Sequence, residues 1–316
     1  MTWHRMLGAA SLAVFVAMAP AVPALAQDKF PSPYGADDEI GAANNLSPAG
    51  VVEAAGLVTE GKTYPLGIVV SGATPAFPPR FVSVTVLTPG QEGGTSFGSN
   101  NGNYNDDIFT GWLGVATQID GLGHLGADNT FYNNNKTADF VNTTGLAKLG
   151  IEGIPPIVTR GVMLDIAGVR GVELMSEGDV ITVGDIEAAA AEAGVTIGKG
   201  DVVILHTGWL SLLGKDDQRF VSQEPGIGVE AAAWLAGRGV VAVGADNWGL
   251  EAVPHADPST FFPAHVELLA RNCVYILENI DTRGLLADQV HEFLFVLGQA
   301  RLKGAVQMII NPVAIR

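Results

Sequence analysis

Hydrophobic residues in the second half of the chain follow two spacings, one typical of helices and one of buried strands. The alanine-rich segment 183–193 comes after Thr182-x-x-Asp185, a capping box, and Gly194 marks its end. Further helices are predicted over 229–236 and from Pro263 onward. Short apolar runs predict buried strands over 202–205, 240–243 and 274–277. This alternation predicts an α/β domain.

The first half of the chain has fewer regular elements and more turns. Ser47-Pro48 opens a helix, and residues 64–70 and 81–87 carry apolar and β-branched residues typical of strands. Residues 88–110 and 126–136 are rich in glycine, asparagine and other polar residues, which predicts two long loops. We find no internal repeat or linker, so a single domain is expected.

The N-terminus has the pattern of a secretory signal peptide. A largely apolar run over residues 7–19 follows Arg5, and Ala24-Leu25-Ala26 fits the cleavage rule. Residues 1–26 are therefore predicted to be removed by cleavage after Ala26, and the mature protein is expected in the periplasm or secreted. Residues 27–46 form a polar N-terminal arm, and 47–316 form the domain. An uncleaved membrane anchor is the alternative; after cleavage, no membrane association is expected.

Composition narrows the classes of partner. The 316 residues are 47% hydrophobic and 16% charged, as in a well-buried globular protein, and the formal net charge is −16. This negative charge argues against binding to nucleic acid or to anionic membranes, both of which need clustered Lys and Arg. It is compatible with a bound cation or a small-molecule substrate. The single cysteine, Cys273, cannot form an internal disulfide bond.

The segment from Thr117 to His124 combines an amide, a carboxylate and an imidazole with two glycines, and we interpret it as a site loop. Asp120 and His124 suit a metal ligand paired with a general acid/base. His265 lies at a predicted helix start and Glu278 at the end of the next strand, so the two can meet on one side of a sheet. A buried carboxylate such as Glu278 needs a cation, a donor or solvent.

Four blocks resemble the cyclase family that includes bacterial kynurenine formamidases. They are, in order, Thr117 to His124, Arg160 to Asp165, Asp201 to Trp209, and His265 to Glu278. The resemblance covers roughly residues 40 to 311. It implies a swivelling β/β/α fold with mixed sheets in a single domain, and association into a dimer or tetramer.

The first block departs from the usual family pattern. The first family histidine falls on Gly114 and the second on Gln118, where the family holds one of two metal ions. The pattern Thr-Gln-x-Asp-x-x-x-His is nevertheless typical of a subfamily. The resemblance therefore implies one divalent ion, zinc or manganese, with Asp120, His265 and Glu278 as ligands. For Gln118 the resemblance leaves two roles open. It is either a fourth ligand through its side-chain oxygen, or a residue that contacts the ligands without binding the ion.

The resemblance also implies a reaction. A divalent ion lowers the pKa of water and polarises a carbonyl, and His124 moves the proton. Thr117, Trp248, Glu251 and His206 are predicted to line the substrate pocket. The first hypothesis is a metal-dependent hydrolase of small-molecule amides or formamides, with N-formylkynurenine the substrate that the resemblance implies first. A cyclic amide or lactone hydrolase, a dehydratase or isomerase, and a degenerate binding protein remain alternatives.

Overall fold

The structure is a computed structural model that describes residues 29–88 and 95–316; the predicted signal peptide, residues 1–26, lies outside them. In these residues nine strands form one mixed sheet in the order β1-β15-β13-β7-β9-β11-β12-β4-β14. Their bounds are β1 (Thr63–Pro65), β4 (Gln118–Asp120), β7 (Ile157–Asp165), β9 (Val202–His206), β11 (Ala242–Ala245), β12 (Tyr275–Glu278), β13 (Glu292–Leu297), β14 (Gln307–Ile309) and β15 (Val313–Ile315).

Short strands β8 (Val180–Ile181) and β10 (Gly226–Ile227) pair with each other, as do β5 (Val141–Asn142) and β6 (Gly145–Leu146). The α-helices are α1 (Pro48–Ala55), α2 (Thr137–Phe140), α3 (Ile166–Val169), α4 (Val183–Ala193), α5 (Asp217–Ser222), α6 (Val229–Ala236), α7 (Pro263–His265) and α8 (Arg283–Ala287). The 3-10 helices are η1 (Gly41–Asn45), η2 (Tyr132–Asn134), η3 (Ile151–Gly153) and η4 (Trp209–Leu212), and η5 (Val266–Arg271) is a π-helix. None of the helices in the described part is long and apolar enough to span a bilayer.

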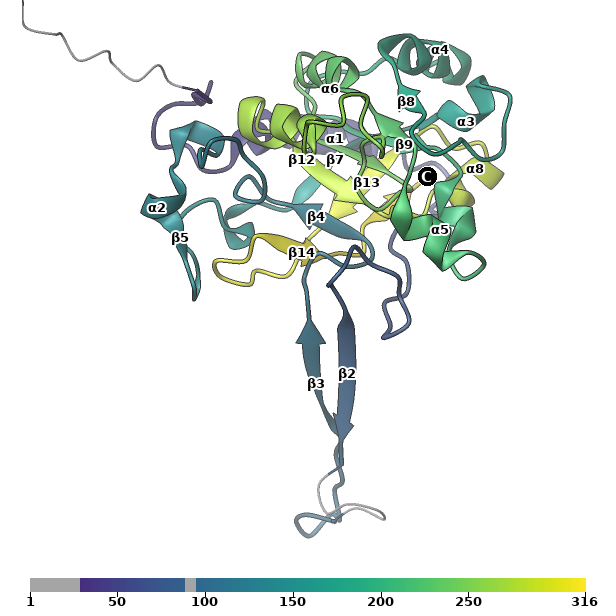
Figure 1. Ribbon diagram of the computed structural model, residues 1–316. Coiled ribbons are helices and arrows are strands. Elements are labelled where there is room, and N and C mark those ends of the chain that lie inside the picture. The colour runs from purple at the N-terminus through teal and green to yellow at the C-terminus, as the bar shows by residue number, and fades with distance from the viewer. Residues whose placement is uncertain (1–28, 89–94) are drawn as a thin grey trace, which may run out of the picture.

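The centre of the sheet is parallel. Strands β7, β9, β11 and β12 run in the same direction and are largely buried, which explains their nearly continuous apolar sequences. Helices α1 and α4 contact β7, and η5 contacts β12. Figure 1 shows α4 and α6 along the upper side of the molecule, with the sheet below them. The predicted α/β alternation after residue 180 is confirmed.

Two predictions for the first half of the chain need correction. The strand expected over residues 64–70 ends at Pro65, because the chain then leaves the sheet and Ile68 donates its N–H to Thr117 Oγ1. The segment 88–110 is not all loop, since its last part belongs to β3 (Asp106–Gly111). The sequence does not predict this strand, because the strand begins with two charged residues, Asp106 and Asp107, and its apolar residues come only after them.

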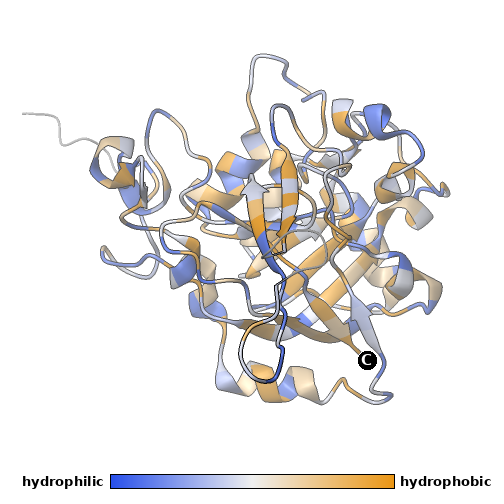
Figure 2. Ribbon diagram, turned by 90° about the horizontal axis from the view of Figure 1, so that it is seen from below, coloured by the Kyte–Doolittle hydropathy of each residue, from blue (hydrophilic) through white to orange (hydrophobic). Residues whose placement is uncertain are grey.

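Strand β3 pairs with β2 (Val82–Leu87) in an antiparallel hairpin that extends away from the body of the molecule (Figure 1). Its apolar side chains are largely exposed, for example Val84 at 60% and Val86 at 66%. Figure 2 looks along this hairpin and shows hydrophobic bands on both of its strands. A two-stranded hairpin with apolar residues open to water has little stability by itself.

Candidate metal centre

Three neighbouring strands place four polar side chains on one face of the sheet. Glu278 of β12 is the register partner of Gln118 in β4, and Gln307 of β14 is the partner of Asp120. Register partners point to the same face, and so do residues two apart in a strand. Gln118, Asp120, Glu278 and Gln307 therefore share this face. The segment interpreted as a site loop is thus a buried strand up to Asp120 and a turn after it.

His265 reaches the same face from the end of α7. Pro263 opens this helix, as predicted, and the helix continues as the π-helix η5; such helices are frequent at functional sites. His265 Nε2 lies 3.6 Å from Asp120 Oδ2 and 3.5 Å from Glu278 Oε1. One ligand atom from each of these three residues lies within 4.8 Å of the others. The structure therefore brings together the three residues expected to bind a metal ion.

The electrostatics of this cluster fit a cation. Burial and the charge of Asp120 raise the pKa of Glu278 to about 7. Burial opposes ionisation of Asp120 as well, but His124 and His265 bring the pKa of Asp120 down to about 2. Asp120 Oδ2 is buried and has no hydrogen-bond partner among the described residues. An ionised oxygen left in this state costs several kcal/mol, on the order of the desolvation penalty, unless a cation binds it.

Glu251 fixes the orientation of His265. Its Oε1 accepts a hydrogen bond from His265 Nδ1 at 2.6 Å and another from the His265 backbone N–H at 3.0 Å. His265 consequently turns Nε2 toward the two carboxylates. A carboxylate on the second nitrogen of a ligating histidine is the usual arrangement at metal sites. Glu251 does not line the pocket that opens onto His124 and His265; both of its oxygens are instead bound to the backbone and side chain of α7.

Gln118 contacts two of the candidate ligands through its amide nitrogen. Nε2 donates to Glu278 Oε2 at 2.6 Å and to Asp120 Oδ1 at 3.2 Å. Because both neighbours are acceptors, the amide must present its N–H groups to them. Of the two roles left open for Gln118, this geometry favours a residue that contacts the candidate ligands without binding the ion over a fourth ligand through its oxygen.

His124 lies beside the cluster and is partly exposed. Its Nε2 is 3.8 Å from Asp120 Oδ2 and 3.5 Å from Gln307 Nε2, which also donates to Asp120 Oδ1 at 2.7 Å. Burial lowers the pKa of His124, and the charge of Asp120 only partly offsets this effect. His124 is therefore neutral at pH 7 and can accept a proton at its ring nitrogen.

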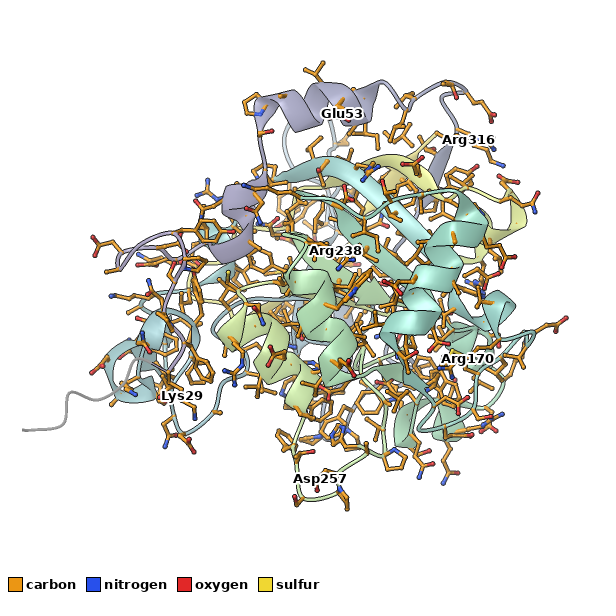
Figure 3. The ribbon with its side chains drawn as sticks, turned by 90° about the horizontal axis from the view of Figure 1, so that it is seen from above. Lys29, Glu53, Arg170, Arg238, Asp257 and Arg316 are labelled. Atoms are coloured by element: carbon orange, nitrogen blue, oxygen red, sulfur yellow. The ribbon has the colours of Figure 1, made fainter. Side chains whose placement is uncertain are left out.

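A pocket of about 340 Å³ opens onto His124, His265 and Glu278. Trp248 forms one wall and stacks on Phe77 with ring centroids 5.4 Å apart. Phe262 follows a loop that reaches the edge of the molecule at Asp257, labelled in Figure 3. The other lining residues are Arg80, Leu125, Gly126, Phe131, Gly249, Phe261 and Gln307. The volume and aromatic walls suit a small aromatic molecule.

Two predicted pocket residues lie elsewhere, so these predictions are wrong. Thr117 is fully buried; its Oγ1 donates to the Asn279 carbonyl and accepts from the Ile68 N–H, which joins two segments of backbone. His206 is also buried, and its Nδ1 lies 2.7 Å from Thr282 Oγ1 and 3.2 Å from Asp246 Oδ2. Both residues stabilise the sheet ends and neither lines the pocket.

Sequence reasoning missed three polar residues of the site. Gln307 stands beside a short apolar run near the C-terminus, but nothing in the sequence pairs it with Asp120. Arg80 stands in a turn and Glu224 after a polar helix, where local patterns carry no information. Glu224 is fully buried, its Oε2 accepts the Trp248 N–H at 2.8 Å, and burial raises its pKa well above the usual range. It holds the turn that carries Trp248.

Comparison with known proteins decides the family. The family model described as a putative cyclase matches residues 64–252, more than half of the chain. A crystal structure of a novel cyclase is 31% identical, with a TM-score of 0.82 over 90% of this chain and 96% of the other. This chain belongs to the cyclase family. The predicted single-domain fold with mixed sheets is confirmed by the same structure.

More distant cyclase-like structures share the fold. Isatin hydrolase A from Ralstonia solanacearum is 19% identical, with a TM-score of 0.58 over 81% of this chain and 92% of its own. A protein described as a predicted metal-dependent hydrolase from Bacillus stearothermophilus is 18% identical, with a TM-score of 0.52 over 81% and 98%. A search of curated proteins gives no match. The structural neighbours of this cyclase thus include metal-dependent hydrolases.

Proposed function

We propose that this cyclase-family protein is a metal-dependent hydrolase of amide or formamide bonds in small aromatic molecules. The observation that carries the proposal is the buried group of Asp120, His265 and Glu278 beside His124, open to a pocket with aromatic walls. The hydrolase names of several structural neighbours support the same reaction class.

The donor set fits one divalent ion. Two carboxylate oxygens and one imidazole nitrogen suit zinc and also manganese. A cation bound there would satisfy Oδ2 of Asp120, which has no hydrogen-bond partner in the part of the chain that the structure describes. When bound, such an ion lowers the pKa of a water molecule toward about 7 and polarises a carbonyl oxygen.

His124 supplies the proton chemistry. Its neutral ring accepts a proton from water at the start of the reaction and returns one to the leaving nitrogen. Asp120, 3.8 Å from Nε2, stabilises the protonated ring between these two steps. Phe77 and Trp248 hold the aromatic part of the substrate, which fixes its carbonyl near the three ligands.

Substrate, compartment and assembly are further parts of the proposal. N-formylkynurenine is the first substrate to test, and an aromatic cyclic amide or a lactone is the alternative, supported by the isatin hydrolase neighbours. Export by the predicted signal peptide would place the enzyme in the periplasm or outside the cell. A homo-oligomer, a dimer or tetramer, is supported by the exposed apolar residues of the β2–β3 hairpin.

The test is a screen of formamides, cyclic imides and lactones by pH-stat, with and without chelator, on protein of measured metal content. The proposal predicts about one equivalent of metal and turnover that chelation abolishes. The variant His124→Ala should keep the metal but lose turnover. Ligand binding without any turnover, unchanged by chelator, would instead indicate a binding protein, and full activity of His124→Ala would remove His124 from the mechanism.

A further inference from the structure

Arg80 is the cationic side chain of the pocket that the metal centre does not use. It stands just before β2, and its NH1 donates to the Gly114 carbonyl at 2.8 Å. No carboxylate of the described residues forms an ion pair with it. Its positive charge nevertheless acts on the site: burial raises the pKa of Glu278 and lowers that of His124, and the charge of Arg80 partly offsets the first shift and adds to the second.

Gly114 leaves the space in which Arg80 and Gln307 lie. A Cβ atom at this position would clash with Gln307 Oε1 and would lie only 2.7 Å from Arg80 NH1. Any side chain here would therefore displace the guanidinium or the amide. The glycine and the arginine belong to one arrangement, in which a guanidinium lies near His124 at the edge of the metal centre.

With a divalent ion bound, the positive and negative charges of the site would not cancel. A divalent ion held by Asp120, His265 and Glu278 would balance the charges of the two carboxylates and would leave the charge of Arg80 without a counterpart among the pocket-lining residues described. A guanidinium in a partly buried pocket gains most from an anion that accepts two parallel hydrogen bonds, and a carboxylate is such a group.

We propose that Arg80 is the recognition group for a carboxylate on the ligand, and that the enzyme prefers aromatic carboxylates to neutral molecules of the same shape. The inference rests on the proposed hydrolase function. It identifies the substrate class as an aromatic amide that carries a carboxylate, or a cyclic amide fused to an aromatic ring whose opening leaves a carboxylate on the aromatic product. Arg80 determines specificity and takes no part in proton transfer.

Binding to the metal-loaded full chain tests this proposal without turnover. Benzoate and benzamide have the same shape and differ in charge, so the ratio of their dissociation constants, measured by calorimetry, reports recognition of the anion. We expect wild type to bind benzoate about tenfold or more tightly than benzamide. In Arg80→Gln this ratio should fall to near one. In Arg80→Lys it should be intermediate, because the ammonium group keeps the charge but cannot donate two parallel hydrogen bonds as the planar guanidinium does.

Control variants distinguish a loss of carboxylate recognition from a loss of folded structure. Arg283→Gln removes an exposed arginine that pairs with Asp281 and does not line the pocket, and it should keep the wild-type ratio. Retained metal content shows that Arg80→Gln is folded. In Gly114→Ala, where the charge remains, the added methyl group should weaken benzoate binding by displacing Arg80. A wild-type ratio in Arg80→Gln would assign the preference to the metal ion and overturn the proposal, as would a ratio near one in wild type.

Turnover distinguishes the two sources of the carboxylate. If the substrate carries it, Arg80→Gln raises KM for N-formylanthranilate about tenfold and leaves KM for formanilide unchanged. If hydrolysis forms it, both KM values stay the same and only inhibition by benzoate weakens. If neither compound is hydrolysed, the proposed function fails on these substrates, and the binding ratio still decides the role of Arg80.

Discussion

Glu251 Oε1 lies 2.6 Å from His265 Nδ1, and this contact sets which nitrogen of His265 faces Asp120 and Glu278 in the candidate metal centre. The same carboxylate accepts the backbone N–H groups of Ala264 and His265 at 3.0 Å, so it ties the side chain to the start of α7. The orientation of the His265 ring and the position of α7 thus both depend on Glu251. The contact spans 14 positions of sequence, across the loop that carries Phe262.

Loss of the Glu251 charge should weaken the metal site. In Glu251→Gln the His265 ring loses its ionised acceptor, becomes a poorer ligand and can rotate, so metal affinity should fall about 10- to 100-fold. Competition with a fluorescent chelator measures this change. His255→Gln, which alters a neighbour of Glu251 outside the ligand set, should keep wild-type affinity. An unchanged affinity in Glu251→Gln would show that the contact does not support the site.

Gln118 should matter for affinity through its two donated hydrogen bonds. Gln118→Leu leaves Asp120 Oδ1 and Glu278 Oε2 with fewer donors, and metal affinity should fall about tenfold. Gln299→Leu is the matched control, because that buried amide donates to the backbone carbonyls of Ile151 and Ile154 and has no hydrogen bond to the proposed ligands. It should lower the melting temperature but leave the affinity unchanged. The opposite pattern would contradict the role given to Gln118.

Metal affinity should depend on pH below neutrality. The pKa of Glu278 is raised to about 7 in the metal-free protein, so below pH 7 the ion must displace a proton from this carboxyl. The pKa of His265 is raised as well, by its hydrogen bonds to the surrounding carboxylates against the opposing effect of burial, and a second proton must leave Nε2. Apparent affinity should fall about tenfold or more from pH 7 to pH 6. Equal affinities at pH 7.5 and 5.5 would contradict this assignment.

The β2–β3 hairpin should mediate self-association. Val86→Glu places a charge on its exposed apolar surface and should lower the molar mass measured by light scattering from that of the dimer or tetramer toward that of the monomer. Val52→Glu is the matched control, since Val52 is 74% exposed on α1. It should leave the assembly intact. A monomeric wild type, or an unchanged assembly in Val86→Glu, would remove the hairpin from the interface.

Residue types and order were sufficient to identify the three proposed ligands. Asp120 lies in a block that resembles the family, and His265 and Glu278 end neighbouring elements that meet on one side of the sheet. The contacts around them could not be predicted. Gln307 joins Asp120 only through the register of two short antiparallel strands, and Glu251 joins His265 through the path of a loop. Neither of these two contacts produces a periodic pattern of residues in the sequence.

The predicted elements were most accurate where apolar residues are continuous. The capping box at Thr182 and Asp185 forms as expected, and the helix ends at Gly194 in a left-handed conformation. Strand β3 was missed because its first residues are acidic and its apolar side chains are exposed rather than buried. Thr117 and His206 were assigned to the pocket because polar residues near strand ends often line sites, whereas here they hold backbone segments together.

The central claim is that Asp120, His265 and Glu278 hold one divalent ion. Anomalous X-ray scattering from crystals of the manganese- or zinc-loaded protein tests it most directly. We predict a single peak about 2.0–2.2 Å from Asp120 Oδ2, His265 Nε2 and a Glu278 oxygen, absent in His265→Ala. A peak elsewhere, or one that persists with full occupancy in His265→Ala, would contradict the account.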